Sequence, residues 1–243
     1  MAKGFDPRES KNDTGQGTNR MPSMVITIDG PAGAGKTTVS RGLADRLGYR
    51  YIDTGALYRG VALAAQRAGV APVDDEGLAA LCQGLRLSFV RDAAGCRLYN
   101  GDEDIEGLIR TPEISMLASA VSARPVVRRF LLEVQRQFAR EKGAVFEGRD
   151  MGTVVFPDAE VKFFLDAPLA VRARRRHAEL AGRSAQTLED VLNDMARRDH
   201  NDQTRAVAPL RPADDAIIID SATLSPEEVV ERMIAAINAC PTD

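Results

Sequence analysis

The chain has 243 residues, 44% of them hydrophobic and 28% charged, which is typical of a globular protein with a sizeable core. Its 32 Lys and Arg are balanced by 35 Asp and Glu, and the formal net charge of -3 argues against a nucleic-acid-binding protein. No apolar run is long enough to span a membrane, and the scattered cysteines lack metal-ligand or disulfide spacing. We therefore expect a cytoplasmic protein with neither nucleic acid nor membrane as a partner, and we take it to be a monomer.

The N-terminal segment 1–23 is polar and has no hydrophobic periodicity, which predicts a disordered tail before a folded domain at 24–240. The apolar run 24–29 predicts the first strand of that domain. A helix follows the next loop and is expected to end near Leu47, because Gly48 is suited to the left-handed conformation that ends many helices.

The loop between this strand and this helix reads Gly30-Pro31-Ala32-Gly33-Ala34-Gly35-Lys36-Thr37 and fits the phosphate-binding pattern G-x-x-x-x-G-K-[ST]. Its glycines allow backbone N–H groups to turn toward one phosphate, and the helix N-terminus adds free N–H groups and a positive dipole end. Lys36 would supply positive charge to the β- and γ-phosphates, and Thr37 would bind Mg²⁺. Thr38 would be the last residue of the segment that binds the phosphates of ATP. The sequence thus predicts a nucleoside triphosphate site.

Strands and helices are expected to alternate along the rest of the chain. The predicted strands are 51–53, 144–147, 161–165 and 216–219, and the predicted helices are 54–68, 112–123, 125–142, 168–180, 188–198 and one that begins at Ser225. Between them, 85–90 and 96–99 predict an antiparallel hairpin inside an insertion at 70–110. This order predicts an α/β fold: a sheet of about five parallel strands, helices on both faces, and ligands at the carboxyl ends of the strands.

Two polar groups follow predicted strands at that edge of the sheet. Thr54, Tyr58 and Arg59 lie on adjoining positions of one helix face. A capped helix with its aromatic ring packed inward is the alternative reading of this group. The second group, Gly148-Arg149-Asp150, follows a buried strand, where charged residues must be either exposed or paired. Both groups are expected to bind a ligand.

Arginines are concentrated on the predicted helix 168–180. Arg172, Arg175 and Arg176 are spaced i, i+3, i+4 and so share a face. Such a run is usually a solvated surface, but neighbouring like charges are destabilising unless anions meet them. Beside a triphosphate site, a phosphate clamp is the better interpretation. Arg198, Asp202 and Arg205 form a second polar series.

Four segments, taken in order, resemble the bacterial cytidylate kinases. They are IDGPAGAGK (28–36), DTGALYR (53–59), GRDMGTVVFP (148–157) and TRAVAPL (204–210). The likeness runs from about Val25 to about Ala239. It implies a P-loop nucleoside monophosphate kinase fold, with 70–110 as a monophosphate-binding insertion and 168–186 as an arginine-bearing lid. It also implies transfer of the γ-phosphoryl group of ATP to CMP or dCMP, with Mg²⁺.

Carried over by position, the resemblance assigns roles to individual residues. Ser119, Arg128 and Asp150 would recognise cytosine; Arg59, Arg149 and Arg205 would hold the acceptor phosphate, with Thr54 and Tyr58 beside it; Arg198 and Asp202 would hold the sugar. Lys36, Arg172, Arg175 and Arg176 would act on the transferring phosphoryl group.

Asp29 and Asp53 are both candidates for holding the waters of Mg²⁺, and their spacing does not choose between them. Ala32, Thr38 and Thr54 stand where some relatives carry Ser, Gly and Ser, and the change at Ala32 could remove one contact to phosphate.

Two other classes of function remain as alternatives. A kinase of the same fold could act on UMP, dTMP or shikimate, although Ser119, Arg128 and Asp150 speak against it. A nucleotide-binding switch is the second alternative, but the sequence has no Asn-Lys-x-Asp motif of the kind that reads guanine.

Overall fold

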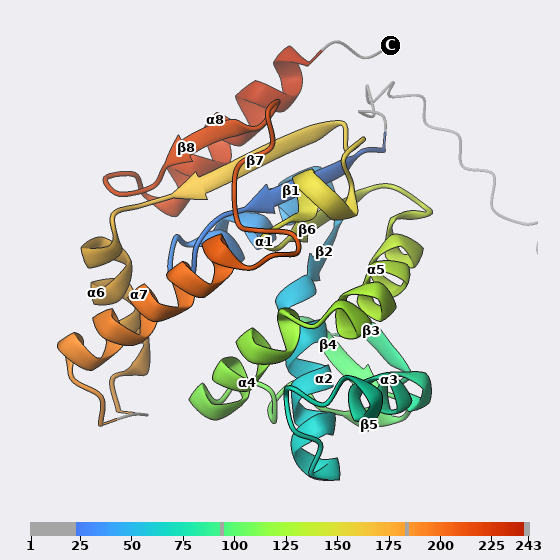
Figure 1. Ribbon diagram of the computed structural model, residues 1–243. Helices are drawn as coiled ribbons and strands as arrows, with labels where there is room; N and C mark the ends of the chain where they lie inside the picture. The colour runs from blue at the N-terminus through green and yellow to red at the C-terminus, as the bar shows by residue number, and fades with distance from the viewer. Residues whose placement is uncertain (1–22, 93–94, 183–184, 241–243) are drawn as a thin grey trace, which may run out of the picture.

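A parallel sheet with the strand order β2-β6-β1-β7-β8 forms the centre of the computed structural model, which describes residues 23–92, 95–182 and 185–240 (Figure 1). Its strands are β1 (Val25–Asp29), β2 (Arg50–Asp53), β6 (Ala144–Glu147), β7 (Val161–Asp166) and β8 (Ile217–Asp220). The predicted sheet of five parallel strands is therefore confirmed. The tail predicted at 1–23 lies almost entirely outside the described residues.

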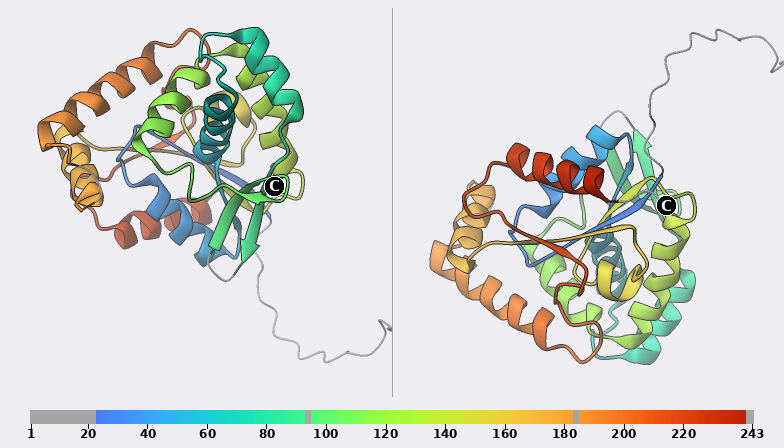
Figure 2. Two further views of the ribbon diagram at one scale, coloured as in Figure 1. Left: turned by 90° about the horizontal axis from the view of Figure 1, so that it is seen from below. Right: turned by 90° about the horizontal axis from the view of Figure 1, so that it is seen from above.

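The two faces of the sheet are covered by different elements, so its central strands are apolar on both sides. On one face, Ile26 and Ile28 of β1 pack with Phe163 and Leu165 of β7 beneath α1 (Lys36–Leu47) and α8 (Pro226–Ala239). On the other face, a short π-helix, η1 (Met151–Val155), and α5 (Pro125–Ala139) cover Phe146. Figure 2 shows α1 and α8 on one side of the strands and η1 on the other.

A second core lies beside the sheet and is built from the part of the chain between β2 and β6. It is built from α2 (Thr54–Ala68), α3 (Asp75–Gly84), the antiparallel sheet β3 (Leu87–Asp92), β4 (Gly95–Asn100) and β5 (Glu103–Asp104), and the helices α4 (Pro112–Ser122) and α5. The pairing of β3 with β4 confirms the predicted hairpin. Helix α3 was not among the predicted elements, although Asp74 caps it and Leu78 and Cys82 give it an apolar face.

The remaining helices, α6 (Leu169–Leu180) and α7 (Leu188–Thr204), pack together through Ala173, Val191 and Met195. A capping box formed by Thr187 and Asp190 begins α7. The predicted end of α7 at 198 was wrong, because no Gly or Pro directly follows Arg198 and buried Asp199 and Asp202 continue its inner face. Figure 1 shows α6 and α7 at one side of the sheet's carboxyl edge and α2 and α4 at the other. Among the described residues, no helix is both long and apolar enough to cross a membrane.

Candidate active site

The phosphate-binding loop joins β1 to α1 at the carboxyl edge of the sheet. Gly30, Gly33 and Gly35 all have positive φ angles, of 144°, 75° and 90°. A Cβ atom at Gly30 would lie 2.0 Å from the carbonyl oxygen of Leu165, so only glycine fits there. Gly35 precedes α1 and no side chain caps that helix, which leaves its first N–H groups available to an anion.

Lys36 lies inside the loop, not on its surface. Its side chain is 4% exposed, and Nζ donates a hydrogen bond to the carbonyl oxygen of Pro31 (2.7 Å). Burial, and then the positive charge of Arg149, lower the pKa of Lys36 to about 7. A phosphate beside Nζ would favour the charged form of the amine.

Thr37 adjoins a carboxylate that the sequence analysis did not identify. Its Oγ1 donates to Oε1 of Glu147, the last residue of β6 (2.9 Å), and Oε2 of Glu147 accepts from the hydroxyl of Tyr51 (2.6 Å). The available signal was position, because Glu147 ends a buried strand and directly precedes Gly148-Arg149-Asp150. Thr54, at the start of α2, donates to the carbonyl oxygen of the same residue (2.6 Å).

Asp29 and Asp53, the two acidic candidates from the sequence, are bound to other groups. The oxygens of Asp29 accept the backbone N–H groups of Met151 (2.9 Å) and Gly152 (2.8 Å) at the start of η1. Asp53 caps α2 and forms ion pairs with Arg59 (2.8 Å) and Arg110 (3.0 Å). Of these carboxylates, Glu147 is the one hydrogen-bonded to Thr37.

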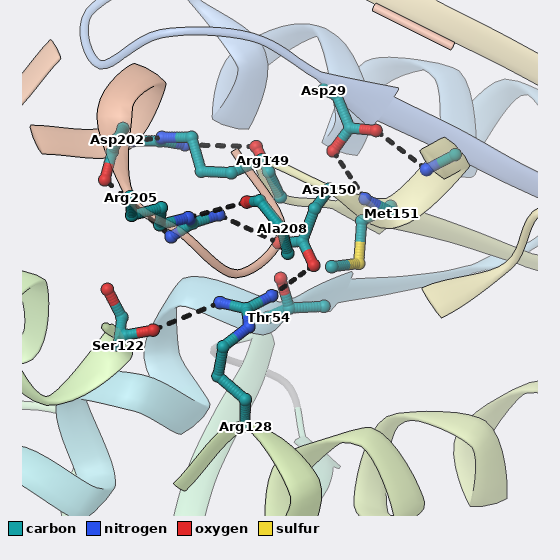
Figure 3. Close-up of polar contacts among 12 residues, drawn as sticks. Asp29, Thr54, Ser122, Arg128, Arg149, Asp150, Met151, Asp202, Arg205 and Ala208 are labelled. Carbon is teal, nitrogen blue, oxygen red and sulfur yellow. Dashed lines mark hydrogen bonds and ion pairs between the residues drawn. The ribbon is translucent and has the colours of Figure 1, made fainter. Parts of the chain in front are cut away.

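Asp150, in the segment that follows β6, lies between two arginines from distant parts of the chain (Figure 3). Its side chain is 2% exposed; Oδ2 accepts from Arg128 of α5, and Oδ1 lies 3.3 Å from Arg205 at the end of α7. Burial is the largest influence on Asp150 and raises its pKa, while the two arginines oppose that shift. The guanidinium of Arg128 also lies over the ring of Tyr58, 5.7 Å from its centroid.

A second carboxylate, Asp202 of α7, accepts from Nε of Arg149 (3.1 Å). The pKa of nearby Arg198 is lowered to about 10, mainly by burial and then by the charge of Arg149, and Nε of Arg198 has no hydrogen-bond partner among the described residues. Ser119 lies half-buried on α4, and its carbonyl oxygen accepts from Ser122 (2.8 Å). The structure thus brings predicted acceptor residues of α2, α5 and α7 around the segment that precedes η1, whereas the hydrogen bond of Ser119 lies within α4.

The three arginines of α6 that were predicted to act on phosphate have different partners despite their helical spacing. Arg172 is buried, donates to the carbonyl oxygen of Ala32 in the phosphate loop (3.0 Å) and pairs with Asp199 (2.7 Å). Arg175 donates to the carbonyl oxygen of Ser221 (2.6 Å), and Arg176 pairs with Glu179 (3.0 Å). The shared helix face does not bring these guanidinium groups to one point, so a common clamp would require Arg175 and Arg176 to change partners.

The chain is similar to known proteins over most of its length. The family model for cytidylate kinase matches residues 26–239. A cytidylate kinase from Geobacter sulfurreducens is 56% identical over 211 residues, which cover 86% of this chain and 91% of the relative. Cytidylate kinases from another Geobacter species and from Mannheimia succiniciproducens are 53% and 45% identical and cover 88% and 89% of this chain, and 92% and 96% of the respective relatives. This chain therefore belongs to the cytidylate kinase family.

Proposed function

We propose that this chain transfers the γ-phosphoryl group of ATP to CMP or dCMP and so produces ADP and CDP or dCDP. The observation that carries the proposal is that the phosphate loop and the buried Asp150 with its arginines lie at the same edge of one parallel sheet, in a chain of this family. Two nucleotide sites at one edge can hold the donor and the acceptor in line for reaction.

At the donor end, the backbone of residues 30–38 and the amine of Lys36 would bind the phosphates of ATP. The oxygens beside this loop fit Mg²⁺, a cation that prefers oxygen ligands, because the hydroxyl of Thr37 and the carboxylate of Glu147 lie 2.9 Å apart. When bound, Mg²⁺ would neutralise charge on the β- and γ-phosphates. We assign the orientation of its waters to Glu147, since Asp29 and Asp53 are engaged elsewhere.

At the acceptor end, the polarity of Asp150 and Arg128 suits cytosine. The N4 amino group of that base is a donor and can face the Asp150 carboxylate, while Arg128 can donate to the N3 or O2 acceptors. Ser119 would supply a third contact to the base. Uracil carries an acceptor where cytosine has its amino group. An unsatisfied buried partner costs about 1–3 kcal/mol, which would disfavour UMP.

Catalysis would depend on positioning and charge, and no general base is needed, because the acceptor phosphate is itself the nucleophile. Arg59, Arg149 and Arg205 would reduce the repulsion between the two anionic substrates by moving from their carboxylates to the phosphate. Arg198 and Asp202 would hold the sugar. The arginines of α6 would complete the site as the lid closes and excludes water.

The finer organisation is proposed on the same grounds. We assign the core of the domain to 24–240, the monophosphate-binding insertion to 70–110 and the lid to 168–186, and we propose a cytoplasmic monomer that uses ATP with Mg²⁺. The alternative that this chain phosphorylates UMP, dTMP or shikimate is not favoured, because its relatives are cytidylate kinases.

An ADP-release assay tests the proposal across CMP, dCMP, UMP, dTMP, AMP, GMP and shikimate. We expect the highest kcat/KM with CMP and dCMP. The variant Lys36→Ala is the control and should retain its circular dichroism spectrum while losing turnover. A preference for UMP, dTMP or shikimate would mean that CMP and dCMP are not the acceptors. Activity with none of the compounds would overturn the proposal.

A further inference from the structure

We infer that Tyr51 is a positioning residue: its hydroxyl holds the Glu147 carboxylate in the orientation that the metal–nucleotide complex requires beside Thr37. The inference rests on the proposed function, because it concerns the use of Mg²⁺ with the donor nucleotide. No family motif identified in the sequence includes Tyr51 or Glu147, and the inference comes from the contacts that the two side chains make.

The pairing of β2 with β6 places the two residues on one face of the sheet. These strands are parallel, and their register sets Tyr51 opposite Val145 and Asp53 opposite Glu147. Tyr51 and Glu147 are therefore diagonal neighbours, a separation that a long side chain can bridge. The observed hydrogen bond from the Tyr51 hydroxyl to Oε2 of Glu147 is 2.6 Å long.

Helix α1 covers this face and completes the arrangement. Thr37 and Arg41 are four residues apart on α1, so they point the same way. Thr37 donates to Oε1 of Glu147, and the guanidinium of Arg41 lies over the ring of Tyr51, 5.2 Å from its centroid. A chain of contacts thus runs from Arg41 of α1 through Tyr51 of β2 to Glu147 of β6, and from there back to Thr37 of α1.

Two hydrogen bonds on two different oxygens fix the plane of that carboxylate. The terminal torsion of glutamate is broad, so a single bond to Thr37 would leave the group free to rotate. The Tyr51 hydroxyl removes this freedom. Burial raises the pKa of Tyr51 well above its ordinary value, and the nearby Asp53 and Glu147 carboxylates raise it further, so the hydroxyl remains a donor at neutral pH.

Calorimetric titration of the full chain with ADP, with and without Mg²⁺, separates a positioning role from a structural one. The variant Tyr51→Phe keeps the ring and removes the hydroxyl. We expect the Mg²⁺ concentration for half-maximal enhancement of ADP binding to rise about 10-fold, the usual scale for losing a group that orients a metal ligand. Binding of ADP without Mg²⁺ and binding of CMP should be unchanged.

Two further variants make the result decisive. Tyr49→Phe is the matched control, since it removes a hydroxyl that accepts from the backbone N–H of Met24 (3.1 Å). Tyr49 directly precedes β2, at the opposite end of that strand from Glu147, so this variant should not change the Mg²⁺ requirement. In Glu147→Gln, addition of Tyr51→Phe should produce no further change. If Tyr51→Phe lowers Tm but leaves the Mg²⁺ requirement of ADP binding intact, or if the two effects add, the inference is overturned. The proposed function fails separately, in the acceptor assay of the unmodified chain.

Discussion

Replacing Asp29 with Asn tests the burial of the carboxyl group that joins β1 to the acceptor side of the site. The side chain is 4% exposed and accepts two backbone N–H groups of η1, from Met151 and Gly152. Burial is the dominant influence and raises its pKa from 3.8 to about 6, although both hydrogen bonds lower it. The folded protein therefore binds a proton at Asp29 more readily than the unfolded chain does.

The direction of the pH dependence follows from this difference. Because the folded pKa is the higher one, the free energy of unfolding should rise as pH falls through about 6, and the gain should be lost as pH rises above that value. One pKa unit corresponds to about 1.4 kcal/mol, so the full difference is about 3 kcal/mol. Acidification from about pH 7.5 to about pH 5 covers only part of this titration, so the expected gain in unfolding free energy over that range is about 1 kcal/mol.

Urea unfolding of the wild type and of Asp29→Asn over this pH range measures the effect. Relative to the variant, the wild type should gain about 1 kcal/mol of unfolding free energy on acidification. Asp53→Asn is the matched control: ion pairs with Arg59 and Arg110 outweigh burial and lower the pKa of Asp53 to about 2, so its contribution should stay constant over the same range. Parallel pH curves for the wild type and Asp29→Asn would refute the reasoning.

Three further predictions concern the two substrates. Asp150→Asn should reduce the preference for CMP over UMP in kcat/KM by about 10- to 100-fold, because it removes a charge-assisted hydrogen bond to the base. An unchanged ratio would mean that Asp150 does not contact the base. Binding of ADP at about pH 8 should take up about one proton, since burial lowers the pKa of Lys36 to about 7. Calorimetry in buffers of different ionisation enthalpy measures this uptake, and Lys36→Met should abolish it. Arg175→Ala should lower kcat by about 100-fold with little change in the KM for CMP, and an effect on KM alone would contradict a lid role.

Much of the fold could be predicted from the sequence, because short apolar runs, glycine stops and capping residues act locally. Gly48 and Gly69 end α1 and α2 with φ angles of 66°, and Ser225 caps α8 through a capping box, as their residue types suggest. The π-helix η1 could not be predicted in this way. Its first two N–H groups are bound by Asp29, a residue far away in the sequence, so its conformation depends on a tertiary contact.

The candidate site shows the same division. The phosphate loop and Gly148-Arg149-Asp150 are continuous in sequence and could be found from it, whereas Glu147 acts with Thr37 and Tyr51 only after two strands and a helix are assembled. Helical spacing was also insufficient for the arginines of α6. It placed Arg172 and Arg175 on one face, but their partners lie in the phosphate loop, α7 and the segment after β8.

The ion pairs of the acceptor side suggest how selection for a phosphorylated ligand would arise. Asp150 pairs with Arg128 and Arg205, and Asp202 pairs with Arg149. A buried arginine separated from its partner costs several kcal/mol, so a ligand must return equivalent interactions before these pairs can open. A phosphate offers two negative charges and several acceptor oxygens to the arginines, and a cytosine amino group can donate to the carboxylate that they leave. A nucleoside without its phosphate offers only the second of these, and it should therefore bind poorly even though its base is correct.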